Sequence, residues 1–214
     1  MPFPRENDFL VNCFPGPIRR QCDPLRRITA RWVVRTWHGW LALLFFLCLP
    51  VVPAADAPRS EYQVKAALLL NFVRFSEWPS AAFAGTNSPF VIGVLGRDPF
   101  GKDLERTFEG KIVRGRAFII RRLSDEQGMR NCHLLFISYS ERRRLRDLRE
   151  KLKGAAVLTV GEMDEFLDYG GVINIRLKNG SVKFDINLKA AQDAQLKLDA
   201  NLAGSAESVR GKYE

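Results

Sequence analysis

Four short runs of apolar residues recur along the chain, at positions 90–95, 117–120, 133–137 and 156–160. Each has the length and composition of a buried strand, and segments of helical character lie between them. Continuous apolar strands that alternate with helices are typical of a parallel sheet covered on both faces. The pattern therefore predicts an α/β fold with a mainly parallel central sheet and helices on both faces.

The segments between these runs carry the caps and the spacing of helices. Ser60 and Gln63 are spaced as in a capping box, which predicts a first helix that ends at Trp78–Pro79. Its apolar face would consist of Leu68, Leu69, Phe72 and Phe75. Further helices are expected from Asp98–Pro99, after a capping box at 124–127, from the cap at 138–141 with the stripe Leu145, Leu148 and Leu152, over 162–167, and in a polar tail from Leu188.

The pattern changes to strict alternation in two segments, 172–178 and 181–187, that flank Asn179–Gly180. This dipeptide favours a type I′ turn, which predicts a C-terminal antiparallel β-hairpin. Closing on the turn pairs Leu177 with Val182, Ile175 with Phe184, and Ile173 with Ile186. The opposite face carries Asn174, Arg176, Lys183 and Asp185. Since Arg176 and Lys183 face each other with like charge, we expect this face to be exposed to solvent or to contact an acidic partner.

The first 54 residues differ in character from the rest. Seven arginines lie between Met1 and Arg35, and thirteen uncharged, mostly apolar residues follow at 40–52. A basic region, a short apolar core and small residues near Ala54 are the parts of a secretory signal, and the core is shorter than the roughly 20 residues that span a bilayer. We predict an export signal over 1–54, cleaved near Ala54, and one exported α/β domain over 55–214. A retained membrane anchor is the alternative.

The basic region is unusually long for a signal. We interpret residues 1–32 as lying before the true start of translation, which Val33 or Val34 would provide. Without residues 1–54 the chain has 26 basic and 21 acidic residues, so its net charge falls from +9 to +5. Because the basic residues are not interleaved with aromatic ones, no nucleic-acid partner is expected.

Little in the sequence points to catalysis. After removal of 1–54 the chain keeps one histidine, His133, inside an apolar strand, and one cysteine, Cys132, which we interpret as a small buried residue. No intramolecular disulfide can then form. No G-x-S-x-G, H-E-x-x-H or C-x-x-C motif is present, so we predict no catalytic residues, no metal and no cofactor. An enzyme and an exported small-solute-binding module are the two classes of function that the residues alone leave open.

One ligand site is predicted from topology alone. In open parallel sheets, ligands bind beyond the carboxyl ends of the strands where the strand order reverses. With the first four strands in the order 2-1-3-4, that crevice lies between the loops after the first and third strands. Its lining would comprise Gly96, Arg97, Asp98, Phe100, Gly101, Ser138, Tyr139 and Ser140. Helix N-termini there favour an anion. The alternative is that Asp98, Ser138 and Ser140 only cap helices.

Nine short motifs spread over the chain together carry a family resemblance. They are VKAALLLNFVRF at 64–75, EWP at 77–79, LGRDPFG at 95–101, GK at 110–111, GR at 115–116, CHLLFIS at 132–138, LTVG at 158–161, GGVIN at 170–174 and FDINL at 184–188. In these motifs and in their order, from about Glu61 to Leu198, the chain resembles the YfiR family of periplasmic proteins. The tail after Leu198 is less apolar than the resemblance leads us to expect.

The resemblance implies a negative regulator that binds the periplasmic region of an inner-membrane diguanylate cyclase or sensor kinase. Cyclic-di-GMP synthesis, and with it biofilm formation, would be restrained; a homodimer is also compatible with the resemblance. We expect Glu77, Trp78 and Pro79 to contact the partner or a ligand, because a tryptophan held by a proline is a rigid amphipathic anchor. The alternative is a core tryptophan that fixes the first helix to the sheet.

Overall fold

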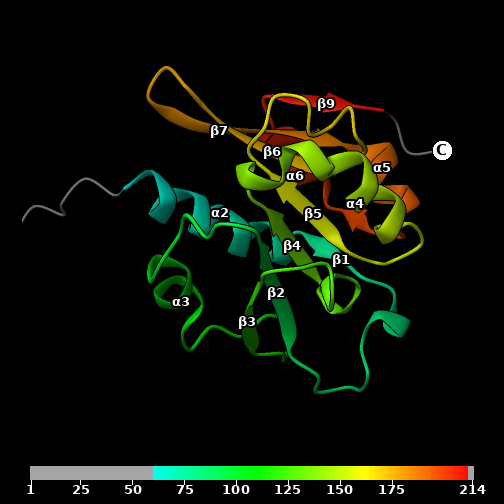
Figure 1. Cartoon of the computed structure of the whole chain (residues 1–214). Helices are drawn as coiled ribbons and strands as arrows, with labels where there is room; N and C mark the ends of the chain where they lie inside the picture. The colour runs from blue at the N-terminus through cyan, green and yellow to red at the C-terminus, as the bar shows by residue number, and fades with distance from the viewer. Residues whose placement is uncertain (1–59, 212–214) are drawn as a thin grey trace, which may run out of the picture. The chain divides into compact units, whose positions relative to one another are not determined.

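The computed structural model describes residues 60–211, and a seven-stranded sheet lies at their centre (Figure 1). The strand order is β3-β2-β4-β5-β6-β7-β9, and the pairs from β3 to β6 are parallel. The strands are β2 (Phe90–Leu95), β3 (Phe118–Leu123), β4 (Leu134–Ile137), β5 (Leu158–Gly161), β6 (Ile173–Lys178), β7 (Ser181–Asn187) and β9 (Ser208–Arg210). The predicted α/β fold, with its mainly parallel sheet and antiparallel hairpin, is confirmed.

Helices cover both faces of this sheet, because alternate residues of each inner strand point to opposite sides. Phe136 of β4 packs in a core with residues of α2 (Glu61–Arg74) and α3 (Asp103–Phe108). Leu135, its neighbour in the chain, packs in a second core with Leu148 of α4 (Leu145–Leu152). Leu145, Leu148 and Leu152 are all buried, as their spacing predicts.

The first helix begins at its predicted capping box. Ser60 Oγ accepts a hydrogen bond from the backbone N–H of Gln63, whose side chain accepts one from Ser60 N–H. The helix ends at Arg74, before the predicted Trp78–Pro79, because Ser76–Glu77 forms β1 with β8 (Lys197–Leu198). Phe75 is consequently 39% exposed and lies outside the apolar face.

Three other helix predictions are corrected by local turns. Asp98 does not start a helix: its carboxylate accepts from Phe100 N–H, and α3 begins at Asp103. The capping box predicted at 124–127 is an Asp125 turn before the 3₁₀ helix η3 (Met129–Asn131). Segment 162–167 is a series of turns, and the basic segment opens as the 3₁₀ helix η4 (Tyr139–Arg144) before α4. A further 3₁₀ helix, η2, spans Ser80–Ala82.

The hairpin has the predicted register and turn, with positive φ at Asn179 (50°) and Gly180 (73°). Its polar face is not all exposed, however. Asn174 is 3% exposed and accepts from Met163 N–H, and Asp185 is 5% exposed and accepts from Ser208 Oγ. The reason is that the segment after β5 and strand β9 pack over the base of the hairpin, so only the part near the turn meets solvent.

The tail is more complex than the single polar helix predicted. It comprises α5 (Leu188–Asp193), β8, α6 (Ala200–Ser205) and β9. Leu196, Leu198 and Leu202 are buried, and this irregular spacing folds the tail back onto the core. Among residues 60–211 no helix has the length and apolar character that crossing a membrane requires. The predicted signal at 1–54 and the start at 33–34 lie outside the described residues.

Candidate functional site

The strand order places a topological reversal between β2 and β4, as predicted, but the loops that follow these strands contact each other directly. Arg97 N–H donates to Ser140 Oγ at 3.0 Å. A Cβ atom on Gly96 would lie only 2.3 Å from that same hydroxyl oxygen. Where the crevice is predicted, the two loops therefore contact each other at Gly96, Arg97 and Ser140.

The polar groups expected there are engaged in local structure. Asp98 accepts from Phe100 N–H at 2.8 Å and forms an ion pair with Arg122 at 2.7 Å. Phe100 is 3% exposed and packs edge-on against Phe136, and Ser138 is also buried. These contacts favour the alternative interpretation, in which the side chains of this region shape turns.

Of the Glu77-Trp78-Pro79 segment, only Glu77 is exposed. Trp78 is half-buried; its indole N–H donates to the His133 carbonyl at 3.1 Å and its ring packs edge-on against Phe90 at 5.3 Å. Trp78 thus joins the chain after α2 to the sheet, which favours its interpretation as a core residue.

His133 and Cys132 have structural surroundings. His133 Nδ1 accepts from Val91 N–H, and Nε2 lies 3.1 Å from the Ala82 carbonyl, so the neutral ring carries its proton on Nε2. Burial lowers the pKa of His133, and burial raises the pKa of the Cys132 thiol to about 11. Both groups are therefore uncharged at neutral pH. Among residues 60–211 no cluster of three or more potential metal ligands occurs.

A buried charge cluster that the sequence analysis missed links α2 to the segment after β5. Lys65 is 4% exposed and forms ion pairs with Glu61 at 2.5 Å and Glu162 at 2.6 Å. The Tyr62 ring lies 4.5 Å from the ammonium nitrogen. Glu61 lies at helical spacing from Lys65, but Glu162 is 97 positions away, so no local pattern could have revealed the cluster.

Two of the predicted site residues, Arg176 and Lys183, lie in the hairpin tip, which comprises residues 176–183. Figure 1 shows it extending away from the helices. Arg176 forms an ion pair with Asp185 at 2.7 Å, and Lys178 forms one with Glu207. Lys183 is exposed, and Leu177 is 54% exposed. The tip therefore presents an apolar side chain beside basic ones.

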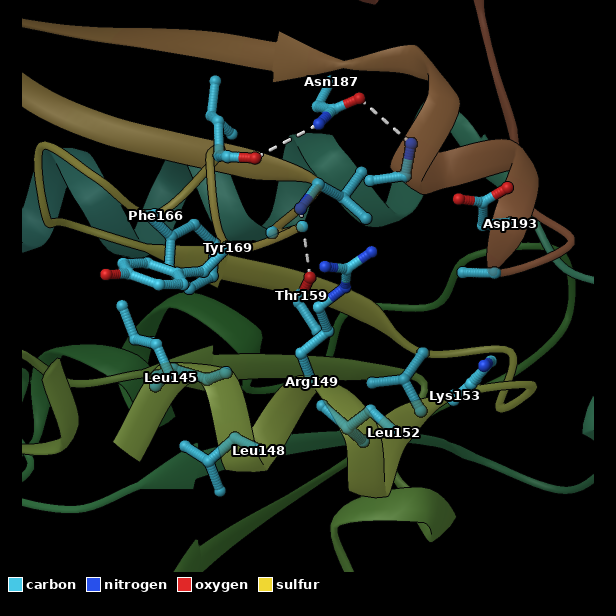
Figure 2. A pocket seen from close by; sticks show the side chains of 18 of the residues that line it. Leu145, Leu148, Arg149, Leu152, Lys153, Thr159, Phe166, Tyr169, Asn187 and Asp193 are labelled. Atoms are coloured by element: carbon cyan, nitrogen blue, oxygen red, sulfur yellow. Dashed lines mark hydrogen bonds between the residues drawn. The ribbon is translucent and has the colours of Figure 1, made fainter. Parts of the chain in front are cut away.

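A cavity of about 830 Å³ lies between α4, the segment 162–171 and the start of the tail (Figure 2). One wall is apolar and comprises Ile137, Leu145, Leu148, Leu152, Val157, Phe166 and Leu167. The remaining lining is mainly polar or small, and includes Arg149, Lys153, Thr159, Gly170, Gly171, Asn187, Ala190 and Asp193. None of the residues predicted as a site from the sequence lines this cavity.

Three glycines give the cavity its shape. Cβ atoms on Gly161 or Gly171 would lie 2.5 or 2.2 Å from the Phe166 ring, so that ring is held between two stretches of bare backbone. Gly170 has a φ of +81°, and a Cβ there would lie 2.8 Å from Arg149 Nε. Arg149 thus reaches from α4 across the cavity to the Gly170 backbone.

A family model described as YfiR/HmsC-like matches residues 62–207. The chain belongs to the YfiR/HmsC-like family. The predicted family resemblance is confirmed, and the YfiR/HmsC-like motifs at 132–138 and 170–174 coincide with β4 and with the glycine pair beside Phe166.

Solved structures similar to this YfiR/HmsC-like chain share little sequence with it. A conserved domain protein from Vibrio cholerae O1 biovar El Tor is 9% identical with a TM-score of 0.47, over 71% of this chain and 60% of that one. An ABC domain in complex with L-Trp from Streptococcus pneumoniae is 10% identical with a TM-score of 0.42, over 56% of this chain and 55% of that one. The search of curated proteins finds no match.

Proposed function

We propose that this protein is a periplasmic regulator that represses an inner-membrane diguanylate cyclase, or a related sensor kinase, by binding its periplasmic region. Family membership carries the proposal, because YfiR-like proteins are regulators rather than enzymes. A regulator of this kind shifts its target between states only through different affinities for those states. Its function therefore depends on a contact surface.

We assign that surface to the hairpin tip. The strand β5 pairs with β6 only at 173–174, and β9 pairs with β7 only at 185–187. Within the described residues, both outer backbone edges of the tip are therefore unpaired and open to a further strand. Leu177 adds an exposed apolar contact and Lys183 a positive charge, which together fit an acidic partner surface with an apolar centre.

The test compares two matched double variants in a strain that lacks the gene. Deletion should raise intracellular cyclic-di-GMP, and the full chain should restore the low level. Leu177→Asp with Lys183→Glu should fail to restore it, through at least about tenfold weaker binding. Ile112→Asp with Lys111→Glu makes the same changes at an exposed site before β3, at the other edge of the sheet, and should repress normally.

Two results would count against the proposal. Unchanged cyclic-di-GMP in the deletion strain, with the membrane sensor expressed, removes the cyclase as the target. Full repression by the Leu177/Lys183 variant would show that the partner contact lies outside the hairpin tip. If that variant instead changes the oligomeric state measured by light scattering, the tip joins two copies of the chain.

A further inference from the structure

The cavity beside α4 contains cationic side chains that lack an acidic partner. Within the described residues, Arg149 and Lys153 form no ion pair and their side chains form no hydrogen bond, whereas two acids of the lining are engaged. Asp168 pairs with Arg210, and Asp193 pairs with Lys189 at 3.5 Å. The unpaired charge of the cavity is therefore mainly positive.

Helical geometry directs these two cations to one place. Arg149 lies on α4, and Lys153 is four residues further on, at the C-cap of that helix, so both follow the same side of α4 beside the buried leucine stripe. Glu150, the acid of the lining without an ion pair, is one residue further round the helix than Arg149, on the side away from the leucine stripe; all three charged side chains are exposed. An anion held at Arg149 and Lys153 would thus lie against the apolar wall rather than against a carboxylate.

We propose that this cavity binds an organic anion with an apolar body, the head group at Arg149 and Lys153 and the body against Leu145, Leu152 and Phe166. The inference goes beyond repression and does not depend on the hairpin contact. A guanidinium suits a carboxylate or sulfonate because its parallel N–H groups donate two hydrogen bonds to one planar acceptor.

The site is preformed, which lowers the entropic cost of binding. Gly161 and Gly171 fix the Phe166 ring, and Arg149 lies against the Gly170 backbone. Figure 2 shows the Arg149 side chain pointing from α4 into the cavity. Thr159 Oγ1 accepts from Val172 N–H at 3.1 Å, so its own O–H is available to donate toward a ligand. Asn187 holds the opposite wall by bonding Ala190 N–H and the Leu167 carbonyl.

The test uses a fluorescent anion, 8-anilino-1-naphthalenesulfonate, with protein purified after expression of the full chain. The dye should bind at one saturable site with enhanced emission. Octanoate should displace it, and octylammonium, which has the same chain length and the opposite charge, should not. Arg149→Gln should weaken dye binding at least about tenfold, and Lys153→Gln should weaken it to a smaller extent.

Arg143→Gln is the matched control, because Arg143 is exposed on the same basic segment, forms no ion pair in the described residues and does not line the cavity. It should bind the dye as the unmodified protein does. Equal binding by Arg149→Gln and Arg143→Gln overturns the proposal, as does displacement by octylammonium as effective as by octanoate, or the absence of saturable binding. Thermal melts of each variant separate a lost site from a lost fold, and the displacement experiment needs no variant.

Discussion

The roles of single residues in this protein depend on contacts with residues that are distant in the sequence. The sequence around Trp78 is compatible with two positions, at a partner interface or in the core. The structure gives it a hydrogen bond to the His133 carbonyl and edge-on contacts with the rings of Phe90 and His133. Because of these contacts, we expect replacement of Trp78 to lower the stability of the fold.

Trp78→Ala should lower the free energy of unfolding by at least about 2 kcal/mol, since a large ring leaves a cavity against Phe90. Trp78→Phe keeps most of the packing and loses the indole N–H bond, so it should cost about 1 kcal/mol. Urea denaturation measures both. An unchanged midpoint for Trp78→Ala, combined with lost repression, would instead make Trp78 a partner contact.

His133 predicts a dependence of stability on pH. Burial lowers its pKa in the folded state below the usual 6.5, so near that pH the unfolded chain binds more protons than the folded one. Stability should therefore fall as the pH drops below about 6.5. His133→Gln removes this titration, and denaturation curves at pH 7.5, 6.5 and 5.5 should show a smaller decline for the variant. Equal declines would show that carboxylates, not His133, cause the loss.

Residue roles were predictable where burial alone decides them. Cys132 and His133 open an apolar run, which predicts structural residues; they lie directly before β4, and both are buried. Topology predicts Asp98 and Phe100 at a crevice, whereas in the structure Asp98 forms an ion pair with Arg122 and Phe100 packs against Phe136. Their partners come from other strands, so the sequence around Asp98 contains no sign of these contacts.

Elements were predicted best where one pattern satisfies both local preference and burial. The hairpin is the clearest case, because the Asn179–Gly180 turn and the paired apolar residues demand the same register. The helix predicted over 162–167 is wrong because local preference and tertiary packing do not agree there. Gly161 and Gly171 enclose the Phe166 ring, and this tertiary contact holds the segment in turns. Strand β9 is short and exposed, and only its pairing with β7 defines it.

Graded substitutions along the hairpin test this account. Ile175→Ala should cost about 2–5 kcal/mol because Ile175 is fully buried opposite Phe184, whereas Leu177→Ala, near the exposed turn, should cost about half a kcal/mol or less. On the polar face, Asn174→Ala should cost about 1–3 kcal/mol, since Met163 N–H loses its buried acceptor. Lys183→Ala should be nearly neutral. If the urea midpoints show a larger loss of stability for Leu177→Ala than for Ile175→Ala, the burial pattern is refuted.

At the scale of the whole molecule, the family could be inferred from the sequence and the cavity could not. The nine motifs keep their order along the chain, and order is a property that a sequence displays directly. The cavity is assembled from β4, α4, β5, the segment 162–171, α5 and Gly211 after β9, and its lining residues are up to 74 positions apart, from Ile137 to Gly211. Arg149 and Phe166 have no common pattern that would place them in one site.

The last prediction concerns where the molecule works. Residues 1–54 lie outside the described structure, and their proposed role as an export signal rests on the basic region and the apolar core at 40–52. When the full chain is expressed in a bacterial host, N-terminal sequencing of the periplasmic fraction should give a start at or near Ala55. Recovery of only the uncleaved chain, in the cytoplasm, would contradict both the signal and periplasmic repression.

A variant that lacks residues 33–54 should fold but remain in the cytoplasm and fail to lower cyclic-di-GMP in the deletion strain, because the target surface lies across the membrane. Replacing 1–54 with the host's own secretion signal should restore repression, which separates the need for export from any need for these particular residues. Equal repression by the cytoplasmic variant would mean that the protein acts on the cytoplasmic side, and the proposed contact with a periplasmic sensor region would then be wrong.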